Sequence, residues 1–161
     1  MTKDMNMRKH LRLLIVIADG EHARFVRPKE NNGLYTESSF NPKTIHERTS
    51  DLGTDRPGAT YHDGSSAHHA LAPRHDLHHM EKEKFGYLIA RKLNDMSFRD
   101  QFDDLAIVAP AHSLSAIRET LDVITNTKVI GTLAKDLVKV PDQDLWEHVR
   151  AWVRPTHRAE V

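Results

Sequence analysis

Hydrophobic residues are spaced in different ways along the chain, and each spacing predicts a different element. The run from Leu11 to Ala18, which is apolar except for Arg12, is typical of a strand buried on both faces. Residues 22–26 alternate between small or apolar and polar side chains, and residues 34–40 can supply a third strand; turn-forming residues precede each segment. Pro28 is expected to end the second strand. The first third is therefore predicted to be a three-stranded meander, with the first strand central in the sheet.

A helical spacing of apolar residues follows a long polar stretch. It predicts a helix from about Asp76 to Met96, with Asp76 as the N-cap. The apolar stripe consists of Leu77, Met80, Phe85, Leu88, Ile89, Leu93 and Met96.

The last third alternates between strands and helices. Leu105 to Ala109 predicts a second buried strand, and Ser113 is the expected cap of the helix after it. Residues 128–133 predict a short strand, and a terminal helix is expected to begin at Asp142 or Asp144. Its buried stripe would contain Leu145, Trp146, Val149 and Val153.

The element order is thus βββαβαβα, which predicts an α/β fold with a single three-layer mixed sheet. Right-handed crossovers place the first strand parallel to the fourth, as in the ribonuclease-H-like topology. One domain over residues 1–154 is expected, with a flexible tail over 155–161.

Composition narrows the functional classes. Lys plus Arg and Asp plus Glu both number 23 among 161 residues, so no net charge attracts the whole protein to nucleic acid or an anionic membrane. The absence of cysteine excludes disulfides, thiolate catalysis and cysteine-ligated zinc. The run from Leu11 to Ala18 is too short to span a membrane, and no small-residue cleavage site follows it. These features predict a cytoplasmic protein without a membrane partner.

The candidate chemistry is concentrated in a polar loop from about Arg48 to His75. Six of the twelve histidines lie between His62 and His79. His75 and His79 are four residues apart, which places them on one face of a helix, and His62 would complete a divalent transition-metal site from the loop. Such a site suggests a metal-dependent hydrolase that also uses His68 and His69. A loop can equally be rich in histidine because it is solvated.

Other catalytic motifs are missing. The sequence has no nucleophile elbow, and no glycine-rich phosphate loop. Asp19 follows the first strand, where a ribonuclease-H-like nuclease needs a carboxylate, but no acid follows the strand at 105–109. Asp19 is therefore interpreted as a turn residue, and the chain as a binding protein rather than an enzyme.

Short motifs in a fixed order resemble the bacterial host-attachment protein family over about residues 10–153. They are Ala18-Asp19-Gly20, Ala23-Arg24-Phe25, Asp55-Arg56-Pro57-Gly58, the segment Leu105 to Pro110 with Leu114 and Arg118 downstream, and Lys135-Asp136-Leu137. Ala59 departs from the arginine that often follows the glycine in that family.

The host-attachment family in turn resembles the middle domain of class-1 archaeal and eukaryotic peptide release factors. The corresponding loop here lacks the Gly-Gly-Gln motif, so hydrolysis of peptidyl-tRNA is not implied. The resemblance implies a non-catalytic protein that contacts RNA or the ribosome. The expected contact residues are Arg48, Asp55, Arg56, His68, His69, Arg74, Lys82 and Lys84. The other interpretation of the lysines is a solvated helix face with Glu-Lys pairs.

Overall fold

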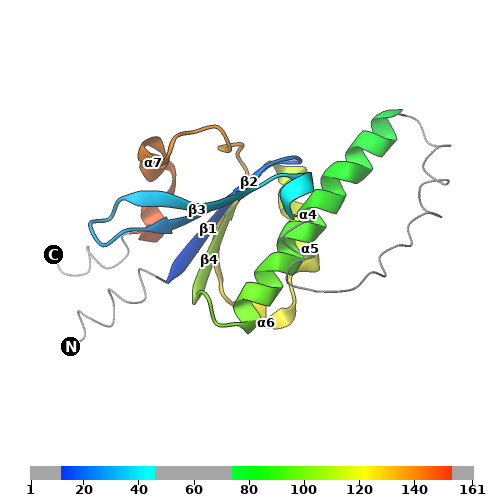
Figure 1. Ribbon diagram of the computed structural model, residues 1–161. Coiled ribbons are helices and arrows are strands. Elements are labelled where there is room, and N and C mark those ends of the chain that lie inside the picture. Colours follow the sequence, from blue (N-terminus) through cyan, green and yellow to red (C-terminus); the bar gives the residue numbers. More distant parts are fainter. Residues whose placement is uncertain (1–11, 46–73, 154–161) are drawn as a thin grey trace.

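The computed structural model describes residues 12–45 and 74–153, with side chains in the second segment from Met80 onward. Five strands form one sheet in the order β3-β2-β1-β4-β5 (Figure 1). Their bounds are β1 Leu13–Ala18, β2 Ala23–Pro28, β3 Leu34–Phe40, β4 Asp104–Val108 and β5 Val129–Leu133.

Strand β1 lies in the centre of the sheet, as its continuous apolar run predicts. It pairs with β2 in antiparallel and with β4 in parallel orientation. Strand β3 continues the meander antiparallel to β2, and β5 is parallel to β4. The sheet is therefore mixed, and the predicted α/β fold class is confirmed.

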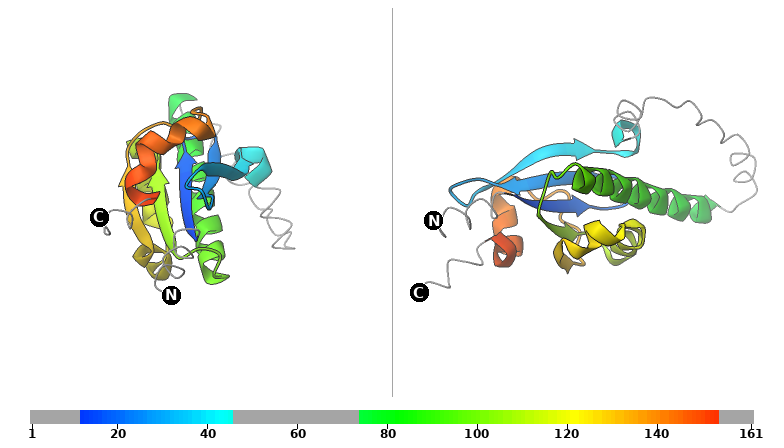
Figure 2. Two further views of the ribbon diagram at one scale, coloured as in Figure 1. Left: turned by 90° about the vertical axis from the view of Figure 1, so that its left-hand side faces the viewer. Right: turned by 90° about the horizontal axis from the view of Figure 1, so that it is seen from below.

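Helices cover both faces of the sheet, which gives three layers (Figure 2). Helix α4 (Arg74–Phe98) and helix α5 (Ala111–Thr120) lie on one face, and α7 (Asp142–Val153) lies on the other. A five-residue helix, α6 (Val123–Thr127), precedes β5. It was not expected from the sequence, because one turn capped by Asp122 is too short to show a helical period.

The alternation of side chains along β1 builds two cores. Leu14 and Val16 pack with Phe85 and Ile89 of α4, while the intervening residues of β1 face α7. The second core contains Leu13, Ile15, Ile17, Leu145, Val149 and Val153.

Two predicted element boundaries are wrong, and one is confirmed. Strand β2 ends at Pro28 as expected, and Pro28 pairs with Leu34 at the hairpin end. Helix α4 begins at Arg74, so Asp76 lies within the helix rather than at its N-cap. Helix α5 begins at Ala111 after Pro110, which places Ser113 inside the first turn. A proline with extended backbone can occupy the N-cap itself, and the serine signal then marks an interior position.

Within residues 12–45 and 74–153, no helix combines the length and apolarity needed to cross a lipid bilayer.

Candidate functional site

Strands β1, β4 and β5 run parallel, so their carboxyl ends meet at one edge of the sheet, which we call the carboxyl edge. The segments that follow these strands supply Asp19, Pro110 and Asp136, which line one hollow of about 320 Å³. Ligands of open α/β sheets commonly bind outside the carboxyl ends of strands. Three short motifs that are far apart in the sequence therefore come together here.

Asp19 holds the turn after β1. Its Oδ1 atom accepts hydrogen bonds from the backbone amides of Glu21 at 2.8 Å and His22 at 2.7 Å. The Asp19 amide donates to the carbonyl of His22 at 2.9 Å. One carboxylate oxygen is thus occupied by the turn, in agreement with the interpretation of Asp19 as a turn residue.

Lys82 of α4 crosses this turn. Its aliphatic stem passes so close to Gly20 that a Cβ atom there would lie 2.5 Å from the Lys82 Cγ atom. Glycine is therefore required for the close approach of the turn and the helix. Lys82 borders the hollow just described and a second one of about 410 Å³, which is also lined by Asn41 and Lys84.

An ion pair connects α4 to α5 beside the first hollow. The Nε2 atom of His112 lies 3.1 Å from the Oε2 atom of Glu83, and both side chains are partly exposed. His112 also lines the hollow, together with the neighbouring Ser113.

The outward face of α4 carries a basic and aromatic stripe. Lys84, Tyr87 and Arg91 follow one another at three- and four-residue spacing, and all three are exposed. We call them the α4 stripe. Within the described part of the chain, none of the three forms an ion pair or a side-chain hydrogen bond. The N-terminal part of α4 extends beyond the sheet (Figures 1 and 2), whereas the α4 stripe lies along the part of the helix whose other side packs on the sheet.

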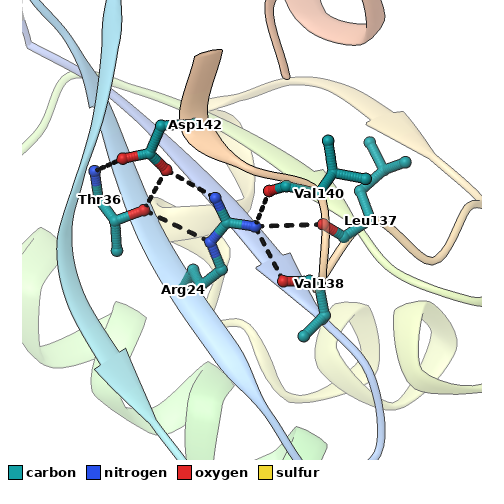
Figure 3. A network of polar contacts seen from close by, with 6 residues as sticks. All are labelled: Arg24, Thr36, Leu137, Val138, Val140 and Asp142. Atoms are coloured by element: carbon teal, nitrogen blue, oxygen red, sulfur yellow. Dashed lines mark hydrogen bonds and ion pairs between the residues drawn. The ribbon is translucent and has the colours of Figure 1, made fainter. Parts of the chain in front are cut away.

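Arg24 of β2 fixes the segment that leads into α7 (Figure 3). Its Nη1 atom donates to the carbonyls of Leu137 at 3.2 Å, Val138 at 2.9 Å and Val140 at 2.6 Å. Its Nη2 atom donates to Asp142 at 2.6 Å. Arg24 therefore has a structural role. It connects the motif Ala23-Arg24-Phe25 to the motif Lys135-Asp136-Leu137 and holds the chain next to Asp136.

The structure describes only some of the predicted site residues. Lys82 lies between the two hollows, and Lys84 lies on the second hollow and in the α4 stripe. Arg74, His75 and His79 belong to α4, but their side chains are outside the described residues. The other predicted contact and metal residues also lie outside them: Arg48, Asp55, Arg56, His62, His68 and His69.

The metal prediction thus remains untested. Among residues whose side chains are described, no group of three or more His, Asp or Glu side chains is arranged to hold a metal ion. The sequence interpretation also missed Tyr87 and Ser113. Tyr87 could have been found from its spacing to the two cations of the stripe, whereas the burial of Ser113 depends on the fold.

Comparison with known proteins gives a family. The family model described as "Protein required for attachment to host cells" matches residues 14–149. The chain belongs to this family. The match covers most of the described elements, from β1 to the middle of α7, and confirms the resemblance drawn from the motifs.

Among curated proteins, no relative matches the sequence. A solved structure, the crystal structure of the archaeal translation termination factor aRF1, is similar with 10% sequence identity and a TM-score of 0.49. The similarity covers 99% of this chain and 42% of that chain, so the host-attachment protein spans less than half of the termination factor. At this level the likeness carries no functional argument.

Proposed function

We propose that this member of the host-attachment family is a non-catalytic protein that binds RNA, with the RNA of the translation machinery as its partner. The observation that carries the proposal is the α4 stripe, in which Tyr87 lies between Lys84 and Arg91 on an exposed helix face. Lysine and arginine bind phosphates, and an exposed aromatic ring stacks on unpaired bases. This combination suits single-stranded or looped RNA better than a protein partner.

The shape of the molecule supports the same proposal. A helix of 25 residues spans about 37 Å, and the described buried residues of α4 lie between Phe85 and Ser97. The α4 stripe lies on the opposite side of the helix from these buried residues, so an RNA strand can contact it from solvent while the other side of the helix packs on the sheet. The proposal puts the protein in the cytoplasm, where the translation machinery is.

The carboxylates near the hollows favour binding over catalysis. Asp19 uses one oxygen for its turn, and Glu83 is paired with His112. A two-metal nuclease needs carboxylates that converge on the ions. The competing hypothesis is a metal-dependent hydrolase that uses His62, His75 and His79.

The test removes charge from the stripe and, separately, from the opposite side of the molecule. The double variant Lys84→Ala/Arg91→Ala is compared with Lys139→Ala/Arg150→Ala, which removes two exposed cations near or on α7. Native protein and both variants are sedimented through ribosome gradients, and their affinity for a short single-stranded RNA is measured by fluorescence anisotropy.

We expect the wild type and the α7-side variant to travel with a ribosomal fraction and the stripe variant to remain at the top. Loss of two phosphate contacts should weaken RNA binding by about tenfold or more. Tyr87→Ala should weaken binding by about five- to tenfold, whereas Tyr87→Phe should retain it because the ring remains. If wild-type protein binds neither ribosomes nor RNA, or if both double variants lose binding equally, the proposal is wrong.

A further inference from the structure

The first hollow at the carboxyl edge contains the open start of α5. Pro110 is the N-cap, no side chain caps the helix, and its first turn has no acidic residue. The first amide bonded within the helix is that of Leu114, which donates to the carbonyl of Pro110 at 2.9 Å. The amides of Ala111 and Ser113 therefore have no acceptor within the helix, and they lie at the positive end of the helix dipole.

Ser113 provides a second and independent sign of a ligand. The residue is only 5% exposed and lines the hollow. Its hydroxyl forms no hydrogen bond with any described residue. The hydroxyl oxygen is not fully enclosed by protein, so a molecule in the hollow can reach it. A mostly buried hydroxyl without a partner is costly unless something that enters the hollow bonds to it.

Lys82 completes the donor set from the other side. Its stem is fixed over Gly20, and within the described residues its ammonium group forms no ion pair. The hollow thus combines one lysine, one serine hydroxyl and the first amides of a ten-residue helix. Oxyanions of phosphate groups are bound by this kind of donor set.

Three carboxylates at the same hollow limit the charge of the ligand. Asp19 is engaged by two amides of its turn, Asp136 accepts a hydrogen bond from the amide of Val138 at 3.3 Å, and Glu21 is exposed. The cations that face them are Lys82 and, when protonated, His112 and His22, whose Nδ1 atom lies 3.6 Å from the Oδ1 atom of Asp19. A phosphodiester has one negative charge and suits this balance better than a phosphate dianion.

We propose that this hollow binds a phosphodiester of an RNA backbone through the Lys82 ammonium group, the Ser113 hydroxyl and the amides of Ala111 and Ser113. The inference rests on the proposed RNA-binding function and assigns it one phosphate subsite.

The subsite is tested by NMR with three small probes. They are the dinucleoside monophosphate UpU, which has a single phosphodiester, the nucleoside uridine, and inorganic phosphate at pH 7.5. Amide shifts of residues 111–113 are followed in the wild type, Lys82→Met and Ser113→Ala, with Lys139→Met as the control. Methionine preserves an apolar stem above Gly20.

We expect UpU to shift these amides, uridine to leave them unchanged, and inorganic phosphate to bind more weakly than UpU. The Kd for UpU should rise about tenfold in Lys82→Met and about three- to tenfold in Ser113→Ala, but remain unchanged in the control. Thermal unfolding of each variant checks that it is folded. If a variant does not fold, the wild-type titrations still decide the question.

The possible results separate the subsite from the general function. Equal shifts with UpU and uridine, or no shift with UpU, overturn the subsite even when longer RNA binds to the α4 stripe. Tighter binding of inorganic phosphate than of UpU overturns the phosphodiester assignment. Shifts with UpU that Lys82→Met weakens support the subsite, and they do so even when ribosome sedimentation fails and the proposed partner is wrong.

Discussion

Asp142 is the acid that connects the sheet to the start of α7. Burial is the largest single influence on its pKa and raises it, but hydrogen bonds from Thr36 and Arg24, together with the charge of Arg24, outweigh burial. The pKa of Asp142 is therefore lowered from its ordinary value of 3.8. A lowered folded-state pKa means that the ionised carboxylate stabilises the fold above pH 3.8, and that this stabilisation is lost as the pH falls below that value.

We expect the stability of Asp142→Asn to depend less on pH in the acid range than the stability of the wild type does. At pH 7 the variant should unfold roughly 2–4 °C below the wild type, because it loses the charge-assisted bond with Arg24. Between pH 4 and pH 2 the difference should shrink, because the wild-type carboxyl becomes protonated. Thermal unfolding by circular dichroism across this range measures both effects.

Asp144→Asn is the matched control for this experiment. Asp144 is exposed on the same helix turn, and its side chain has no hydrogen bond or ion pair within the described residues. Its variant should follow the wild-type curve. A constant difference between wild type and Asp142→Asn at every pH would contradict the lowered pKa, because it would mean that the pKa of Asp142 is the same in the folded and unfolded protein.

At the scale of elements, close approach at a glycine determines how α7 lies on the sheet. Gly131 of β5 lies directly beneath the indole of Trp152, and a Cβ atom at this position would overlap the indole Nε1. The helix can therefore cover the edge strand only while position 131 has no side chain. The partly buried Trp146 and Trp152 both pack on this side of the sheet.

We expect Gly131→Ala to push Trp152 outward and lower the free energy of unfolding by about 1–3 kcal/mol. Chemical denaturation measures the loss, and tryptophan fluorescence should shift to longer wavelength in the folded state. Thr132→Ala changes an exposed neighbour on the same strand and should have a small effect. An unchanged emission spectrum in Gly131→Ala would contradict this packing.

The elements were largely predictable from the sequence because burial leaves a periodic pattern. The mostly apolar run from Leu11 to Ala18 predicts a central strand on its own, and the stripe from Leu77 to Met96 predicts the helix that covers it. The start of α5 was predicted wrongly, because Ser113 fits the usual N-cap preference and Pro110 occupies that position instead.

The site was less predictable than the fold. Asp19, Pro110 and Asp136 come together only because β1, β4 and β5 are parallel and in register. The spacing of residues along the sequence does not show that these three residues lie close together in space. The polar loop at 48–75 was the predicted site because of its histidines. The described residues instead make Tyr87 and Ser113 candidates for ligand binding.

At the scale of the whole molecule, metal binding distinguishes the two functional hypotheses. Under the RNA-binding proposal, we expect added zinc or manganese to leave the thermal unfolding midpoint of untagged protein unchanged. A hydrolase site at His62, His75 and His79 would instead stabilise the fold by about 2.7 kcal/mol at a metal concentration one hundred times the Kd.

The control is the triple variant His62→Ala/His75→Ala/His79→Ala, measured with and without metal. A rise in midpoint that disappears in this variant would establish the metal site and favour the hydrolase. A rise that persists would indicate metal binding elsewhere in the chain.

The central place of β1 also determines how the chain folds. Strand β1 pairs with β2 across a short turn, but its pairing with β4 joins residues roughly 90 positions apart, and closing such a long loop costs entropy before any contact repays it. We therefore expect the meander to form first and to leave one edge of β1 unpaired until β4 arrives. During synthesis on the ribosome, that edge would stay open until the second half of the chain has emerged.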